Sequence, residues 1–560
     1  MAKKKKRYLI YIYIILVLIA GSTLLVLFQL NPLLVRFTKN KLESLVNQDP
    51  DRLYDITYDS LKIDIYSGNI SVFDFSIKPR KQILDSLAEN NIPRKIVIDF
   101  HLGDFKLIDI ELIKFLKSGE IELDAVLFEN LTGKVYVNDT LKAENSVTVS
   151  TDLLTQSFIS TLLHKVELKN GSLDWINTVN DSSINLSFDN FYVHMADLYT
   201  DSAMIKKPHG IAIDEISFSF ENFQNKLVKN YIVKSKKVTF NSFDNKYSIV
   251  EPEMIPTQEK VDSQNYLKLH VSEVELIGIN YDSLLYNDHL LVDRVRIKEP
   301  QFTYVRPPQR LQKDTLRFLP AYTFKSIPIG LYIDTIEIRN GLFDYLKHGY
   351  NEPLVKLDAH NLNVDGLNFS SDPKLMPEDK TFYVTGSGLF LNEAPLLLKF
   401  RFPITDPHST FFIEAEMDTI NAESLNQIVK NSKQFMIKSG IINRMTFNIN
   451  GNDTLARGTL NIDYKNLKLQ AIKVNEEDFT DVKRKGFNTF LMNTFAKTKN
   501  DPARTSFKEG IIYLERNDNW TFLDYSLDAM MTGILTSMVP EAKGMVVPKE
   551  ERKAIKKENK

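Results

Sequence analysis

Two stretches of the chain repeat each other: VELKNGSLDW at residues 166–175 and IEIRNGLFDY at residues 336–345. In each, apolar and polar residues alternate on both sides of an Asn-Gly pair, which is typical of strands with one buried face. Asn-Gly also favours a tight hairpin turn, so each stretch predicts a strand, a turn and a second strand. The similarity continues downstream, where Leu186, Phe188, Asn190, Phe191 and Val193 align with Leu357, Ala359, Asn361, Leu362 and Val364.

Looser copies of this unit begin at Val295 (VRIKEPQFTY) and Val274 (VELIGINY). One unit repeated along a chain predicts a mainly β protein, with an elongated, curved, mostly antiparallel repeat sheet. Chance similarity is the alternative explanation for the looser copies, because every all-β chain contains alternating strands. The same alternation recurs from about residue 56 to residue 520, most clearly at 61–65, 216–220, 267–271, 447–450 and 460–464.

Tight turns and a few short helices are expected between the strands. Ser67-Gly68-Asn69 and Asn450-Gly451-Asn452-Asp453 are typical of hairpin turns. Helical patterns are confined to short segments, which we expect at 32–46, 107–116, 153–163, 422–429, 487–496 and 522–538.

The N-terminus carries a basic cluster and then an uncharged span. Lys3, Lys4, Lys5, Lys6 and Arg7 precede residues 8–30, which include no charged residue. As a helix this span rises about 35 Å, enough to cross a hydrocarbon core of ~30 Å. Basic residues stay cytoplasmic, so the pattern predicts a single transmembrane helix with the body of the protein beyond the membrane. A cleaved signal sequence is the alternative, since Ala20-Gly21-Ser22 supplies small residues, although the apolar run continues past them.

Composition limits what the body of the protein can be. Hydrophobic residues make up 43% of the chain and charged residues 25%, with 35 Phe and 23 Tyr, which predicts a large folded core. A net charge of -2 provides no overall attraction to nucleic acid, so we expect no nucleic-acid partner. The chain contains no cysteine, which excludes disulfides and thiolate chemistry.

The sequence contains no recognisable motif for catalysis. The nearest two histidines, His348 and His360, are 12 residues apart, so no His-x-x-x-His pair exists, and neither a phosphate-binding loop nor a nucleophile elbow is present. Carboxylates such as Asp282 and Asp288 are better explained as turn and surface residues. We therefore expect no enzymatic activity, no catalytic residue, no metal and no cofactor.

The stretch SGIINRMTFNINGNDTLARGTLNIDYKNLKLQ, residues 439–470, resembles the C-terminal module of the AsmA-like proteins of Gram-negative envelopes. In that module a strand ends in a Gly-containing turn, a Gly-bearing strand follows, and a Tyr-x-x-Leu-x-Leu strand comes next. These places are occupied by Gly451, Gly458, Tyr464, Leu467 and Leu469. The end of the module is also similar to GFNTFLMNTF from Gly486, to FKEGIIYLERNDNW from Phe507 and to the helix around Met530, Met531 and Met538.

The resemblance covers residues 330–540 and the anchor, and it implies an inner-membrane protein with a periplasmic body. It implies a curved sheet whose apolar face binds or conducts lipid in outer-membrane maintenance. The domains are then the basic stop and anchor (1–35), the repeat region (36–330) and the C-terminal module with its terminal helix and basic tail (331–560). Expected partners are membrane lipids, the inner membrane and other envelope proteins.

Lipid-contact candidates come from the alternating apolar positions near the second repeat and in the C-terminal module. On an open groove these residues would contact lipid: Ile336, Ile338, Phe343, Leu460, Ile462, Leu467 and Leu469. The alternative is a structural or regulatory scaffold for outer-membrane assembly, in which the same residues form a closed core. A charge placed at Ile338 and Ile462 is expected to leave the protein folded if the groove is open.

Overall fold

The computed structural model describes residues 53–549, apart from 65–66, 90–95, 112–113, 115–116, 139–159, 178–182, 202, 205–209, 227–229, 258–264, 307–315, 349–352, 429–434, 475–481, 485–497 and 539–542. The predicted anchor and the predicted helices at 32–46 and 487–496 lie outside the described residues. Within the part of the chain that is described, no helix is both long and apolar enough to span a membrane. The chain divides into two compact units, Met1–Val250 and Glu251–Lys560.

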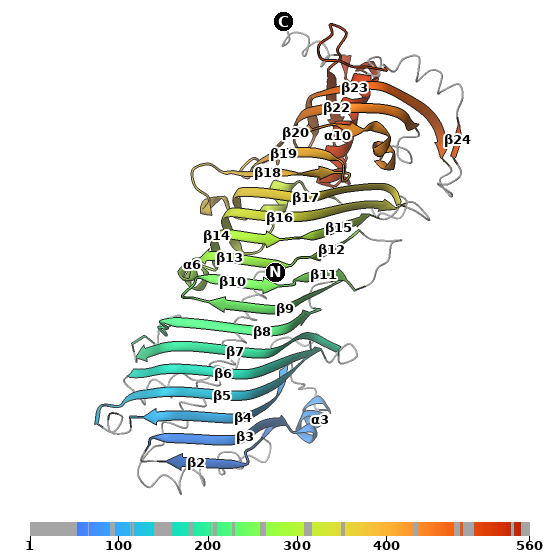
Figure 1. Cartoon of the computed structure of the whole chain (residues 1–560). Coiled ribbons are helices and arrows are strands. Elements are labelled where there is room, and N and C mark those ends of the chain that lie inside the picture. The colour runs from blue at the N-terminus through green and yellow to red at the C-terminus, as the bar shows by residue number, and fades with distance from the viewer. Residues whose placement is uncertain are drawn as a thin grey trace. The chain divides into compact units, whose positions relative to one another are not determined.

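The first unit is a β-sheet in which strands β3 to β9 follow one another in chain order (Figure 1). Both β1 and β2 pair with β3, and β10 pairs with β9. Among the described pairs of this unit, β5 and β6 are parallel and the others are antiparallel. The elements are β1 (Tyr54–Thr57), β2 (Ser60–Asp64), β3 (Asn69–Pro79), α3 (Lys81–Glu89), β4 (Ile96–Ile110), β5 (Glu120–Val137), β6 (Ser160–Asn177), β7 (Ser183–Asp201), β8 (Glu215–Asn225), β9 (Tyr231–Asn241) and β10 (Lys246–Val250).

The second unit begins with short strands: β11 (Glu253–Pro256), β12 (Tyr266–His270), β13 (Glu273–Ile279), β14 (His289–Lys298) and β15 (Gln301–Arg306). Strands β14 and β15 are separated by Glu299 and Pro300, and both pair in parallel with the long strand β16 (Gly330–His348). Strands β14, β15 and β16 therefore belong to the same compact unit, which begins at Glu251.

Antiparallel pairing then runs through the rest of the second unit. The strands are β17 (Pro353–Ser370), β18 (Thr381–Phe390), β19 (Ala394–Pro403), β20 (Phe411–Met417), β21 (Ile420–Asn421), β22 (Phe435–Gly451), β23 (Leu455–Val474), β24 (Val482–Arg484) and β25 (Gly510–Glu515). The helices are α6 (Tyr281–Asn287), α7 (Pro320–Lys325), η2 (Pro373–Leu375), η3 (Ala422–Leu425), α10 (Phe522–Met538) and α11 (Lys543–Val546). The expectation of a mainly β, mostly antiparallel fold with a few short helices is confirmed.

The repeat predicted from residues 166 and 336 is present in the strand pairing. Trp175 of β6 is in register with Leu186 of β7, and Tyr345 of β16 is in register with Leu357 of β17. The aligned residues Trp175 and Tyr345, and Leu186 and Leu357, thus occupy equivalent places in the strand pairing. Each repeat also begins with a strand that pairs in parallel with the one before it.

The Asn-Gly pairs of the two repeats are β-bulges, so the prediction of hairpin turns there was wrong. Asn170 and Asn340 have φ of 54° and 56°, and the register shifts around Gly171 and Gly341 while β6 and β16 continue on both sides. A left-handed Asn before Gly suits a bulge as well as a hairpin turn. Here the neighbouring strands supply pairing partners on both sides of the bulge, which keeps the chain extended.

Other local predictions had mixed outcomes. Gly68, with φ of 65°, lies in the turn between β2 and β3, and residues 451–454 join β22 to β23, as expected. Helix α10 has the predicted bounds 522–538, and η3 begins the predicted helix at 422–429. The helices predicted at 107–116 and 153–163 were wrong where described strands replace them, because 107–110 belong to β4 and 160–163 to β6.

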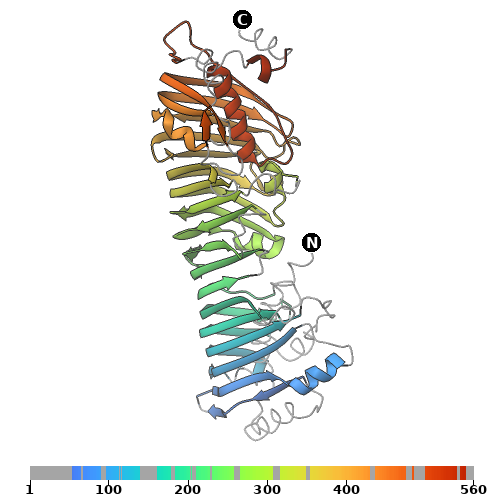
Figure 2. The ribbon, with the colours of Figure 1, turned by 90° about the vertical axis from the view of Figure 1, so that its right-hand side faces the viewer.

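Helix α10 lies across one face of the later strands of the second unit (Figure 2). The main core of this unit lies between that face and the helix, and it includes Phe411, Ile442, Leu460, Ile462 and Tyr525, all fully buried or nearly so.

Candidate functional site: an apolar cavity beneath helix α10

One face of the second sheet is apolar from strand to strand. Because side chains alternate along a strand, residues in register across neighbouring strands share a face. One such row crosses six strands, β17, β18, β19, β20, β22 and β23, and consists of Val364, Gly386, Leu398, Ala415, Phe447 and Leu460. No residue of this row carries a charge. We call this side of the sheet the inner face.

Helix α10 covers the inner face and completes the edge of the sheet. Strand β25 pairs with β23 on one side, and on its other side the helix supplies hydroxyl groups. Thr536 Oγ1 accepts from the Ile511 backbone N–H at 2.8 Å and donates to the Ile511 carbonyl at 2.9 Å. Thr532 Oγ1 accepts from the Tyr513 N–H at 3.2 Å. These bonds satisfy edge groups that would otherwise need water or another strand.

Close packing holds the C-terminal half of α10 against the sheet. At Gly533 a Cβ atom would lie 2.7 Å from Ile512 Cγ1 and 2.9 Å from Leu460 Cβ, so only glycine allows this approach. Farther along the sheet, strand β18 carries two glycines among the residues that line the space beneath α10. Gly386 and Gly388 on β18 both turn toward it. The missing side chains leave space between helix and sheet.

That space is a cavity of about 350 Å³. Its volume is at the small end of the ~300–1,000 Å³ typical of small-molecule sites. None of its lining residues is charged, and Ser387 is the one lining residue with a polar side chain. The helix contributes Leu523, Leu527, Met530, Met531, Ile534 and Met538. Three of these are methionines, whose flexible side chains adapt to ligands of varying shape.

The structure brings together some of the predicted contact residues. Phe343, Ile462 and Leu469 line the cavity. Leu460 and Leu467 are buried in the surrounding core and do not line it. Ile336 is half-buried and packs against the same core, while Ile338 is half-buried and in register with Val364, which lines the cavity.

Ile462 has no exposed surface, although it lines the cavity. Sequence periodicity assigned this residue to the apolar face, but it carried no information on what covers that face. Reasoning from sequence also missed the lining residues of β18 and β19, among them Val384, Leu398 and Phe400. The alternation in LLLKFRFP at 396–403 was the available signal.

Polar groups gather beside the cavity, around Arg306. Arg306 of β15 forms an ion pair with Asp524 in the first turn of α10, and both side chains are less than one tenth exposed. The Tyr345 hydroxyl donates to Asp524 Oδ1 at 3.0 Å. Burial, and then the Asp524 charge, raise the pKa of Tyr345 far above its usual range, so it stays a hydrogen-bond donor.

Apolar packing connects this charged group to the cavity. Tyr345 and Leu357 form a small buried cluster with the partly buried Leu523 and Leu527. Leu357, Leu523 and Leu527 line the cavity. The Tyr304 ring stacks on Tyr345 at 5.9 Å between centroids, and its hydroxyl accepts from Asn265 Nδ2 at 2.9 Å. We call Tyr304, Arg306, Tyr345 and Asp524 the Arg306 cluster.

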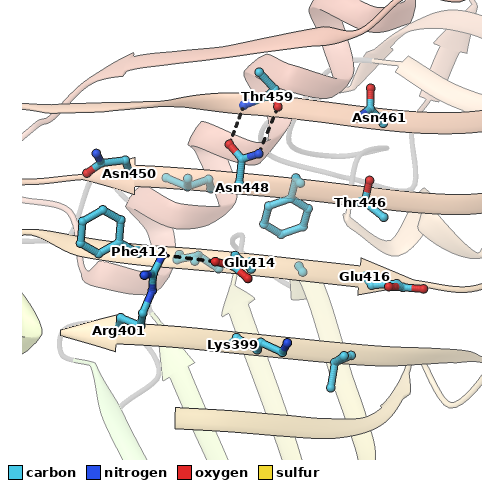
Figure 3. A pocket seen from close by; sticks show the side chains of 15 residues that line it. Lys399, Arg401, Phe412, Glu414, Glu416, Thr446, Asn448, Asn450, Thr459 and Asn461 are labelled. Carbon is cyan, nitrogen blue, oxygen red and sulfur yellow. Dashed lines mark hydrogen bonds and ion pairs between the residues drawn. The ribbon is translucent and has the colours of Figure 1, made fainter. Parts of the chain in front are cut away.

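The opposite face of the same sheet is polar and has a shallow hollow of about 560 Å³ (Figure 3). Its side chains come from β19, β20, β22 and β23 and form cross-strand pairs. Arg401 Nη2 lies 3.2 Å from Glu414 Oε1, and Asn448 bonds Thr459 through its side chain at 3.2 Å. Opposite charges and paired amides on an exposed face are what a solvated antiparallel sheet usually presents. The inner face is therefore the better candidate for a ligand site.

Comparison with known proteins adds no assignment. No protein-family model matches the chain, and no curated protein matches it significantly.

Proposed function

We propose that this chain is a non-enzymatic, membrane-anchored envelope protein that binds the acyl chain of a lipid on the inner face of its β-sheet. The observation that carries the proposal is the cavity beneath α10, whose lining is uncharged and almost wholly apolar. Transfer of each CH₂ group from water into such a site contributes about 0.8 kcal/mol. A lipid chain entering from a bilayer exchanges one apolar surrounding for another, which suits carriage or exchange of lipid.

Half-buried apolar side chains extend the inner face beyond the cavity. Phe302 of β15 stacks on Phe343 of β16 at 5.6 Å between ring centroids, and Leu269 of β12 is in register with Phe302. These residues are only partly buried within the described part of the chain. They support an apolar path that leads along the sheet toward the cavity. The elongation and curvature of the sheet, and transport along it, stay predictions.

A second candidate is a scaffold for outer-membrane assembly. The observation in its favour is that α10 closes the inner face over β23, where Leu460 and Ile462 have no exposed surface. A fully closed core would leave no room for a ligand. The cavity beside these residues favours lipid binding over this alternative.

Mass spectrometry of lipids that co-purify with the full-length chain tests the proposal. The chain is extracted in a zwitterionic detergent and compared with its Gly386→Leu and Thr385→Leu variants. Residue 386 faces the cavity, whereas Thr385 is exposed on the other face. We expect acyl lipids with the wild-type chain and with Thr385→Leu, and a clear loss with Gly386→Leu. Absence of lipid from the wild-type chain would refute lipid binding.

The proposed location has a test of its own. Alkaline phosphatase fused after Lys560 is active only beyond the inner membrane. We expect an active fusion, because Lys3 to Arg7 precede the uncharged span. An inactive fusion, together with an active cytoplasmic reporter at the same position, would overturn the periplasmic assignment.

A further inference from the structure

The Arg306 cluster places a buried ion pair on a mostly apolar face. Arg306 lies two residues after Tyr304 on β15, so both side chains are on the inner face. Buried arginine and aspartate side chains are rare and are found paired. Replacing such a pair by apolar residues often leaves stability unchanged or higher, so a buried pair is weak evidence for a stabilising role. A use other than stability is therefore worth testing.

A second cation, Arg317, lies in the chain between β15 and α7. The segment before α7 is fixed to the segment before α10, because the Arg317 N–H donates to the Asp518 carbonyl at 2.8 Å and Arg516 donates to the Arg317 carbonyl. Arg317 is half-buried, and its side chain forms no ion pair or hydrogen bond with another residue that the structure describes. Burial, and then the Asp524 charge, raise the pKa of Tyr304, while the Arg306 and Arg317 charges oppose that rise.

Asp524 has alternative partners that allow it to release Arg306. Its Oδ2 atom accepts from Thr521 Oγ1 at 2.6 Å and from the Thr521 N–H at 3.3 Å. In return the Asp524 N–H donates to Thr521 Oγ1 at 3.2 Å. This reciprocal arrangement is a helix capping box, and it holds the carboxylate at the start of α10 independently of Arg306. Only Oδ1 is engaged by Arg306 and Tyr345.

We propose that the Arg306 cluster binds the phosphate group of a lipid whose acyl chain occupies the cavity, with Asp524 holding that place in the empty protein. Arginine binds phosphate through two parallel N–H donors, and Arg306, Arg317 and the Tyr345 hydroxyl together supply such donors. Leu357 and Leu523 pack with Tyr345 and also line the cavity, so the two places are neighbours. The inference rests on the proposed function, because it assigns the headgroup end of the same site.

A competition between two lipids tests the assignment. The delipidated full-length chain is incubated with mixed vesicles of phosphatidylglycerol and diacylglycerol that have identical acyl chains in equal amounts. It is then repurified and the bound lipids are quantified. We expect about a tenfold excess of phosphatidylglycerol, the effect of a charge-assisted hydrogen bond. Equal binding of the two lipids would overturn the headgroup site and leave lipid binding intact, whereas no bound lipid would refute the proposed function itself.

Three variants locate the site. Arg306→Gln combined with Asp524→Asn keeps a neutral hydrogen-bonding pair and is expected to bind the two lipids equally. Arg317→Gln changes a half-buried residue, so its folding is expected to be normal, and it should lower the excess severalfold even if the double variant fails to fold. The matched control is Arg401→Gln with Glu414→Gln, an ion pair on the opposite face, which should keep the wild-type excess. If Arg317→Gln and the double variant both keep the wild-type excess of phosphatidylglycerol, the assignment is overturned.

Free phosphate is the other source of the same chemistry. An excess of inorganic phosphate is added in a separate arm of the competition. We expect phosphatidylglycerol to remain bound, because its acyl chains hold the headgroup at the site. Displacement by inorganic phosphate would assign the cluster to the free ion and overturn the lipid assignment.

Discussion

Filling the cavity from the sheet is expected to stabilise the protein while it excludes the ligand. Gly386 on β18 is buried and faces the cavity. A Cβ atom there would lie 3.5 Å from Val364 Cγ2 and 3.9 Å from the Asn363 carbonyl, which are ordinary van der Waals distances. Gly386→Leu is therefore expected to fit without moving the backbone, with its side chain in the cavity.

The size of the effect follows from the four carbon atoms added. At about 0.8 kcal/mol per CH₂ group, their burial contributes up to ~3 kcal/mol to the free energy of unfolding. The rotamer freedom that leucine loses on folding reduces this gain by about 0.5–1 kcal/mol. Replacing glycine also lowers the backbone entropy of the unfolded chain, which raises the free energy of unfolding by a similar amount. We expect the delipidated variant to be more stable than the wild type by about 2–3 kcal/mol, which is a rise of several degrees in Tm.

Urea unfolding followed by tryptophan fluorescence measures this change. The chain has two tryptophans, so in a Trp175→Phe background Trp520 reports on the second unit alone. Gly388→Leu is the contrasting variant, because a Cβ atom at Gly388 would lie 2.8 Å from the His360 carbonyl oxygen and should destabilise the sheet. Lower stability of Gly386→Leu than of the wild type, or undiminished lipid in that variant, would refute the reasoning.

Three further predictions concern the core, the turns and one histidine. Ile462→Asp should prevent folding of the second unit, since burial of a carboxylate at a fully covered position costs several kcal/mol; a folded variant by circular dichroism would show that the inner face is open there. Gly68→Ala should cost about 1–3 kcal/mol in urea unfolding, because Gly68 has φ of 65° and the added Cβ atom would lie 2.8 Å from Ile110 backbone atoms. Gly341→Ala should cost less, because Gly341 lies outside the left-handed region. Equal costs would contradict the bulge assignment. Asp197 and then Glu122 raise the pKa of His164 above 6.5, so the stabilisation by His164 is present below pH 6.5 and is lost as the pH rises through the folded pKa. The urea midpoint of the first unit should fall over that pH interval in the wild type and change less in His164→Asn. Parallel profiles of the two proteins would exclude the effect.

Strand periodicity was the most reliable information in the sequence. Alternation predicted the mainly β fold, and Leu186 and Leu357, which the sequence alignment pairs, have equivalent registers in β7 and β17. It failed at Asn170-Gly171 and Asn340-Gly341, because the same dihedral preference at Asn suits a turn or a bulge. The choice depended on whether neighbouring strands pair with both halves of the segment, and that is a long-range property.

The sequence by itself therefore determined which residues are apolar on one face of each strand and which segment forms α10. Only the tertiary structure decided what that face contacts. Leu460 became closed core because Gly533 allows the helix to approach it, while Gly386 leaves a cavity nearby where the sheet lacks a side chain. Arg306 and Asp524, 218 residues apart in the chain, meet beside that cavity. Side-chain alternation is a local property of a strand, whereas coverage and enclosure depend on elements that are brought together only by folding.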